Sequence, residues 1–98
     1  MSKLLDLALE TIRTRRQEFE ERFGVRLIGV VGSVARGEER ADSDVDIVYD
    51  ISGRPTLFDL SEAAFELEDE FEREVDLVDP KSMRPNARAF IEKDLVVA

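Results

Sequence analysis

The chain has neither cysteine nor histidine among its 98 residues. The absence of cysteine excludes disulfides, thiol catalysis and zinc–thiolate sites. The absence of histidine removes the commonest general base and the usual zinc ligand. Any catalytic chemistry must therefore use carboxylates, arginine or lysine, hydroxyls, backbone amides and a bound metal ion.

Long apolar segments are also missing, and positive charge is scarce. No stretch approaches the length of a membrane span, and residues 1–3 lack the apolar core of a signal peptide, so we expect a cytoplasmic protein with no membrane partner. The 23 acidic and 14 basic residues give a formal charge of −9, which repels a nucleic-acid backbone and argues against direct binding of nucleic acid. A nucleotide with its metal counter-ions is compatible with this charge, because a local pocket can oppose the global field.

The length suits one domain, and we interpret residues 1–98 as a single compact α/β unit. Residues 3–23 show the periodicity of an amphipathic helix, with Ser2 as a cap and Gly24 just past the end. A second helix is expected after Thr56, which forms an acidic capping box with Asp59. Its core-facing stripe is predicted to contain Leu57, Leu60, Ala64, Leu67 and Phe71.

Three strands are expected between and after these helices, over residues 25–31, 44–51 and 75–78. A turn of helix is expected over residues 34–37. The tail is predicted to hold a short helix that starts near Pro85, and residues 95–97 can add a further strand. Three basic residues of the tail can either contact phosphates or balance acidic neighbours, and we favour the second interpretation: Arg84, Arg88 and Lys93.

Three aspartates are candidates for a metal site. Asp44 and Asp46 point to the same face of a strand, because successive strand residues alternate between faces. Two such carboxylates repel each other unless a cation lies between them, and Mg²⁺ prefers oxygen ligands. Asp76 is expected to project from a neighbouring strand toward the same point. Three converging acids can hold two cations roughly 4 Å apart, which stabilises both oxygens of an in-line displacement.

Gly32 and Ser33 supply a candidate phosphate site beside these acids. Glycine lets the backbone approach a phosphate closely, and the amides of the following turn form an anion site. Arg36 lies one turn further on and can reach a phosphate with its planar guanidinium. Each feature alone is more often a surface turn or a solvated strand edge. Their order and spacing together favour a site for metal and triphosphate.

The segments GSVARG at 32–37, SDVD at 43–46 and VDLV at 75–78 resemble the minimal nucleotidyltransferases, the smallest members of the DNA polymerase beta superfamily. The likeness covers nearly the whole chain. It implies the nucleotidyltransferase fold, a small mixed β-sheet flanked by helices. It also implies that Asp44, Asp46 and Asp76 bind two Mg²⁺ ions, and that Gly32 and Ser33 bind the triphosphate of ATP.

The resemblance further implies a partner. Family members of this size often act as antitoxins that transfer AMP from ATP to a tyrosine of a helical HEPN ribonuclease, and a homodimer is an alternative assembly. Two rival functions stay open: an antitoxin that neutralises its partner by occlusion alone, and a nucleotidyltransferase for a small hydroxylated compound such as an aminoglycoside. A ligand-free structural domain is the remaining interpretation.

Overall fold

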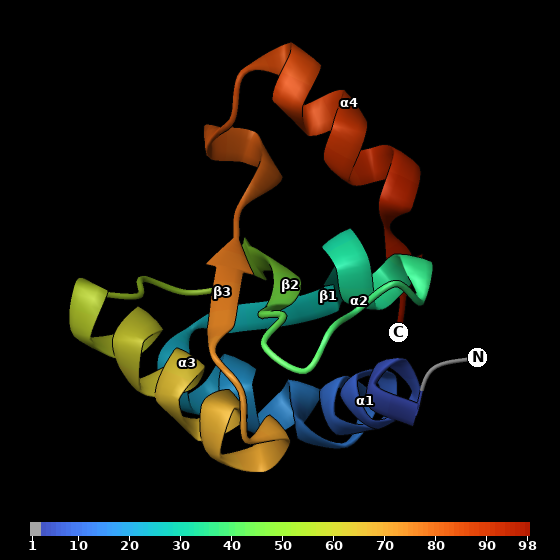
Figure 1. Cartoon of the computed structure of the whole chain (residues 1–98). Helices are drawn as coiled ribbons and strands as arrows, with labels where there is room; N and C mark the ends of the chain where they lie inside the picture. The colour runs from blue at the N-terminus through green and yellow to red at the C-terminus, as the bar shows by residue number, and fades with distance from the viewer. Residues whose placement is uncertain (1–2) are drawn as a thin grey trace.

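The computed structural model describes residues 3–98. It contains a four-stranded mixed sheet with helices on both faces (Figure 1). The strands are β1 (Val25–Val31), β2 (Val45–Ile51), β3 (Val75–Val78) and β4 (Val96–Val97), in the spatial order β3-β2-β1-β4. The strand β1 runs antiparallel to β2 and β4, whereas β2 and β3 are parallel. The predicted mixed α/β class is therefore confirmed.

The helices also follow the expected order. They are α1 (Lys3–Phe23), α2 (Gly32–Arg36), α3 (Leu57–Phe71), the 3-10 turn η1 (Pro80–Ser82) and α4 (Pro85–Asp94). The predicted bounds of three elements were wrong by one or two residues, because α2 spans Gly32–Arg36, β2 begins at Val45 and β4 begins at Val96. The predicted cap Ser2 lies outside the described residues. No helix in residues 3–98 is both long enough and apolar enough to cross a membrane.

The hydrophobic core lies between one face of the sheet and the layer formed by α1 and α3 (Figure 1). Its largest fully buried side chains come from both of these layers, and include Ile12, Phe19, Leu27, Ile47 and Leu67. The expected alternation along β2 is confirmed, because Val45, Ile47 and Tyr49 all belong to the core. The residues between them must therefore face the opposite side of the sheet.

The predicted capping box of α3 is confirmed, whereas the predicted set of core-facing residues on this helix needs a correction. The Asp59 amide donates to the Thr56 hydroxyl at 3.2 Å, and the Thr56 amide donates to the Asp59 carboxylate at 2.9 Å, which completes the capping box. Leu57 was predicted to face the core but is 83% exposed. The buried positions of α3 are Ala63, Leu67 and Phe71, with Leu60 partly buried against the core, so Ala63 takes the place predicted for Ala64.

The opposite face of the sheet is covered by α4, which arches over it in Figure 1 and buries none of its own residues fully. Two features fix this helix. Arg88 donates hydrogen bonds to the carbonyls of Pro80 (3.0 Å) and Met83 (3.4 Å). At the far end, β4 passes so close to β1 that a Cβ on Gly29 would lie 2.2 Å from the Val96 carbonyl oxygen. The candidate site described next lies between α4 and this face of the sheet.

Candidate active site

Asp46 and Asp76 lie side by side on the face of the sheet that is turned away from the hydrophobic core, which we call the open face. They are direct partners in the parallel pairing of β2 with β3. Each alternates with core residues of its own strand, Val45 and Ile47 on β2 and Val75 on β3, so both carboxylates point away from the core. The predicted convergence of these two acids from separate strands is thus observed.

The carboxyl of Asp46 is electrostatically perturbed. Its pKa is raised from 3.8 to about 6, first by partial burial and then by the negative charges of Asp76 and Asp44. A hydrogen-bonding contact with Asp76 raises it further, and the Arg36 charge opposes the shift. Burial and neighbouring negative charge thus make the ionised carboxylate more costly than in water, and a bound cation would reduce that cost.

Asp44 is near this pair but does not share its cleft. It precedes β2 and lines a separate hollow of about 180 Å³ with residues of the loops at 41–43 and 72–74. Arg73 fixes this loop by donating to the carbonyls of Arg40 (2.7 Å) and Ser43 (3.1 Å). The role of Arg73 was not predicted, since no local pattern marks an arginine as a loop anchor.

As the side chains stand, no three acidic groups of residues 3–98 are placed closely enough to hold a metal ion together. The donor set nevertheless suits Mg²⁺, because it consists of carboxylate oxygens alone. The pKa of Asp46 is raised by burial and by the charges of Asp76 and Asp44, and a divalent cation would oppose both effects. The residues present therefore fit Mg²⁺, and the assignment of Asp44, Asp46 and Asp76 as metal ligands stays a prediction.

Gly32 brings the backbone directly against the acids. Its φ is +78°, and a Cβ at this position would lie 2.4 Å from Oδ2 of Asp46. No side chain caps the start of α2. The first amides of this helix are therefore available to an anion, and Ser33 lies among them. Only glycine satisfies both the left-handed φ and the close approach.

Arg36, the predicted phosphate ligand, is already paired with two carboxylates. Its Nε donates to Glu38 at 2.8 Å, and its Nη1 lies 2.6 Å from Oδ2 of Asp94 on α4. These partners raise the pKa of Arg36, so the guanidinium is firmly charged. The Asp94 contact was not predicted, because it joins residues far apart in the sequence.

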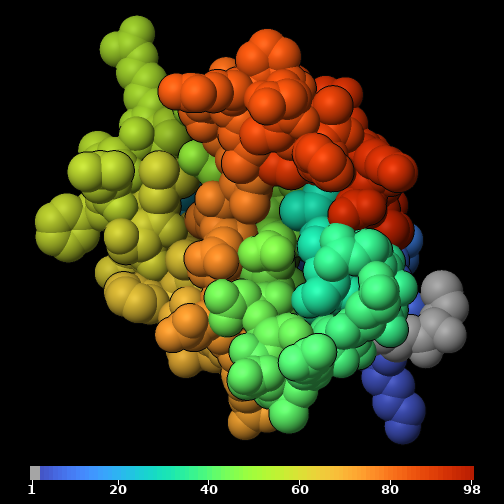
Figure 2. Space-filling model, turned by 45° about the horizontal axis from the view of Figure 1, so that its top comes forward, coloured from blue at the N-terminus to red at the C-terminus, as the bar shows by residue number. Residues whose placement is uncertain are grey.

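A cleft of about 320 Å³ lies between the sheet and α4 at this point. In Figure 2 the orange and red C-terminal segment borders a hollow above the cyan and green segments that carry α2 and β2. Of the six predicted site residues, Gly32, Asp46 and Asp76 line this cleft; the other three lie around it. Its remaining walls are Val31, Val78, Met83, Phe90, Ile91 and Asp94, of which the four from the tail were not predicted.

The interpretation of the tail arginines requires one correction. Arg88 was expected to balance acidic neighbours, but its guanidinium bonds to backbone carbonyls of the segment that connects β3 to α4. It therefore positions the wall of the cleft. A carbonyl partner leaves no trace in the sequence, which is why this role could not be predicted.

Three comparisons with known proteins agree with this geometry. A domain model described as "Nucleotidyltransferase domain" matches residues 12–98. A Thermococcus cleftensis protein named protein adenylyltransferase MntA is 40% identical over 89 residues, which cover 90% of each chain. A solved structure described as a candidate minimal nucleotidyltransferase superposes with a TM-score of 0.69 at 34% identity, over 90% of this chain and 93% of that one. A second, described as a toxin–antitoxin with AMP-PNP, has a TM-score of 0.67 at 21% identity, over 86% and 69% of the two chains.

Proposed function

This chain belongs to the nucleotidyltransferase domain family, and from that premise we propose that it transfers AMP from ATP to a hydroxyl group of a protein partner. The single observation that carries the proposal is the in-register pair Asp46–Asp76, which lies beside Gly32 in one cleft. Carboxylates from two strands next to a glycine-lined anion site suit a metal-bound triphosphate.

We propose that Asp44, Asp46 and Asp76 hold two Mg²⁺ ions. When bound, these ions supply charge neutralisation of the phosphates and lower the pKa of the attacking hydroxyl. The support is the all-carboxylate donor set and the raised pKa of Asp46. The ions also explain how the cleft of a chain with a charge of −9 can accept a polyanionic nucleotide.

The chain's own residues bind and orient the nucleotide, and one of them accepts a proton. The backbone at Gly32 and the start of α2, with the Ser33 hydroxyl, binds the β- and γ-phosphates, and Arg36 adds a charged contact. The acceptor oxygen forms a bond to the α-phosphorus while the bond to the bridging oxygen breaks. Pyrophosphate leaves with that electron pair, and the hydroxyl proton passes to Asp76, whose side chain is exposed to an incoming acceptor.

We propose a tyrosine of a helical HEPN-type toxin as the acceptor. The T. cleftensis relative is named as a protein adenylyltransferase, and a structural neighbour is described as a toxin–antitoxin with AMP-PNP. The cleft lies at the surface under a single helix, so a protein as large as a toxin can approach Asp76. We place this protein in the cytoplasm because transfer of AMP to a partner requires ATP, which is present there.

The test is a mass measurement on the helical partner after incubation with this protein, ATP and Mg²⁺. The expected result is a gain of one or more AMP units on a tyrosine. Asp46→Asn should reduce the rate about 100-fold or more, because a charge essential to the transition state is lost. Asp69→Asn is the matched control: it makes the same change at an exposed position of α3, outside both the cleft and the hollow beside it. Equal activity of both variants would remove the assignment.

A second candidate function is neutralisation by binding alone. It is favoured by three large apolar side chains that α3 leaves exposed, at 83% for Leu57, 81% for Phe58 and 62% for Phe65. Measuring the toxin's own activity in the same incubations, beside the AMP mass, decides between the two functions. If Asp46→Asn still neutralises the toxin, occlusion is sufficient; if neutralisation is lost with AMP transfer, catalysis is required.

A further inference from the structure

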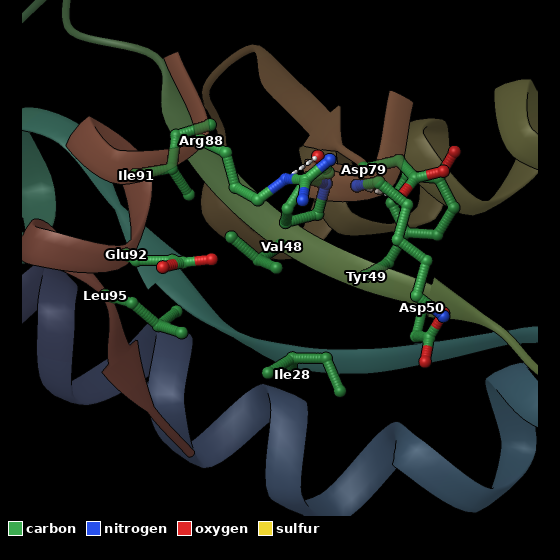
Figure 3. Close-up of a pocket in the computed structure, with 11 residues that line it drawn as sticks. Ile28, Val48, Tyr49, Asp50, Asp79, Arg88, Ile91, Glu92 and Leu95 are labelled. Atoms are coloured by element: carbon green, nitrogen blue, oxygen red, sulfur yellow. Dashed lines mark hydrogen bonds and ion pairs between the residues drawn. The ribbon is translucent and has the colours of Figure 1, made fainter. Parts of the chain in front are cut away.

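A second hollow lies next to the acidic cleft, also between the open face of the sheet and α4 (Figure 3). Its volume is about 370 Å³, within the range of roughly 300–1,000 Å³ that is usual for small-molecule sites. The sheet contributes Ile28 and Val48 to it, and α4 with its following residue contributes Ile91, Glu92 and Leu95. Nothing in the mechanism above uses this space.

The hollow and the cleft are neighbours that share one wall residue. Ile91 lines both of them. On β2, Asp46 lines the cleft and Val48 lines the hollow, and two residues of strand span about 7 Å. This distance is comparable to the reach of a ribose between a phosphate and its base. A nucleotide whose α-phosphate lies at Asp46 can therefore place its base above Val48.

The chemistry of the walls suits a flat ring with a polar edge. The floor is apolar, formed by Ile28, Val48 and Leu95, while charged side chains stand at the rim. The two cations at this rim are already engaged: Lys81 bonds to Asp50 at 3.0 Å, and Arg88 bonds to backbone carbonyls. They are therefore not arranged to hold a further phosphate.

Glu92 is the exception at this rim. Its carboxylate projects from α4 into the hollow, toward Val48 (Figure 3). Within residues 3–98 its side chain makes no hydrogen bond or ion pair. A carboxylate accepts hydrogen bonds but cannot donate them. It matches the exocyclic amino group that adenine presents, and it opposes the carbonyl oxygen that guanine presents at the same place.

We propose that this hollow binds the nucleobase of the substrate and that Glu92 selects adenine over guanine. The inference rests on the proposed function, because it takes the phosphate position from the acidic cleft. It adds a base-binding subsite and a residue that decides nucleotide preference. It does not require that AMP transfer take place.

Calorimetric titration of the purified chain with ATP, GTP and inorganic tripolyphosphate, each with excess Mg²⁺, tests the subsite. Ile28→Phe fills the hollow, and Ile51→Phe makes the same change at a 52% exposed position outside it. The affinity for ATP relative to tripolyphosphate should fall about tenfold or more in Ile28→Phe and stay unchanged in Ile51→Phe. If the affinity for ATP relative to tripolyphosphate is unchanged in Ile28→Phe, the proposal is overturned. This holds even if the variant modifies its partner more slowly.

Glu92→Gln tests selectivity, because an amide can both donate and accept. The wild-type preference for ATP over GTP should fall about tenfold in this variant, with tripolyphosphate binding unaffected. Equal preference in the wild type, or an unchanged preference in the variant, refutes the role of Glu92. Because binding is the readout, a chain that selects ATP in this way but transfers no AMP would refute the proposed function and leave this inference intact.

Discussion

Nη1 of Arg36 on α2 lies 2.6 Å from Oδ2 of Asp94, the last residue of α4. This ion pair connects the predicted phosphate ligand to the helix that covers the cleft. Glu38 accepts a hydrogen bond from Nε of the same guanidinium, so a phosphate that binds Arg36 shares it with two carboxylates. We therefore expect nucleotide binding to act on the position of α4 through this side chain.

Asp94→Asn should raise the affinity for Mg²⁺–tripolyphosphate several-fold, because Arg36 is released from one competing charge. Calorimetric titration measures this effect. Asp69→Asn, on the exposed surface of α3, removes the same charge at a distance and controls for the change in net charge. A loss of affinity in Asp94→Asn would show instead that the pair holds Arg36 in its binding position.

Gly32→Ala should abolish nucleotide binding, because its Cβ would lie 2.4 Å from Oδ2 of Asp46 and displace that carboxylate. Gly37→Ala is a close match, since φ is +72° there, compared with +78° at Gly32, but a Cβ meets nothing within 4 Å. Both variants should lose about 1 kcal/mol of unfolding free energy from the strained backbone. Only Gly32→Ala should lose ATP affinity in a titration, and retained affinity would contradict the close approach.

Asp46→Asn should stabilise the metal-free protein above pH 6. The folded pKa of about 6 lies above the ordinary value of 3.8, so the folded state binds the extra proton, and its stability falls as pH rises between these values. The asparagine variant lacks this penalty. The gain is on the order of 1 kcal/mol, because the partly exposed site is screened by water.

Urea unfolding with a chelator, at pH 3.5 and pH 7, measures this gain, which should be present only at the higher pH. Asp50→Asn should show the opposite sign, since the Lys81 hydrogen bond lowers the pKa of Asp50 and its charge is stabilising. If Asp46→Asn were the less stable protein at pH 7, the carboxylates would not repel each other as the structure indicates.

Glu66→Gln should weaken the contact between α1 and α3. Glu66 pairs with Arg15 at 2.6 Å and also contacts Arg22, and these hydrogen bonds lower its pKa. The stabilisation is therefore present at neutral pH and is lost as pH falls below about 4.5. We expect a cost of about 0.5–1 kcal/mol at pH 7, as for other partly exposed pairs. Thermal unfolding at pH 7 and at pH 3.5 measures it, and an equal loss at both values would indicate packing rather than charge.

Local sequence patterns were sufficient to predict the order of the elements and the direction of the acidic side chains. Helical and strand periodicities, the Thr56–Asp59 capping box and Gly24 beyond α1 act within a few residues, so they are readable from local patterns. The alternation on β2 fixed which face Asp46 occupies as soon as Val45 and Ile47 were identified as core. These features required no knowledge of how distant segments meet.

The neighbours of these residues depend on contacts between distant segments, which are seen only in the folded chain. The parallel register that pairs Asp46 with Asp76, the ion pair of Arg36 with Asp94 and the position of α4 above two hollows all join segments distant in sequence. The exposure of Leu57 has the same origin, since the packing of α3 against the core buries other positions of this helix. Periodicity states which side of an element is apolar, but packing of the whole chain selects the neighbour that covers it.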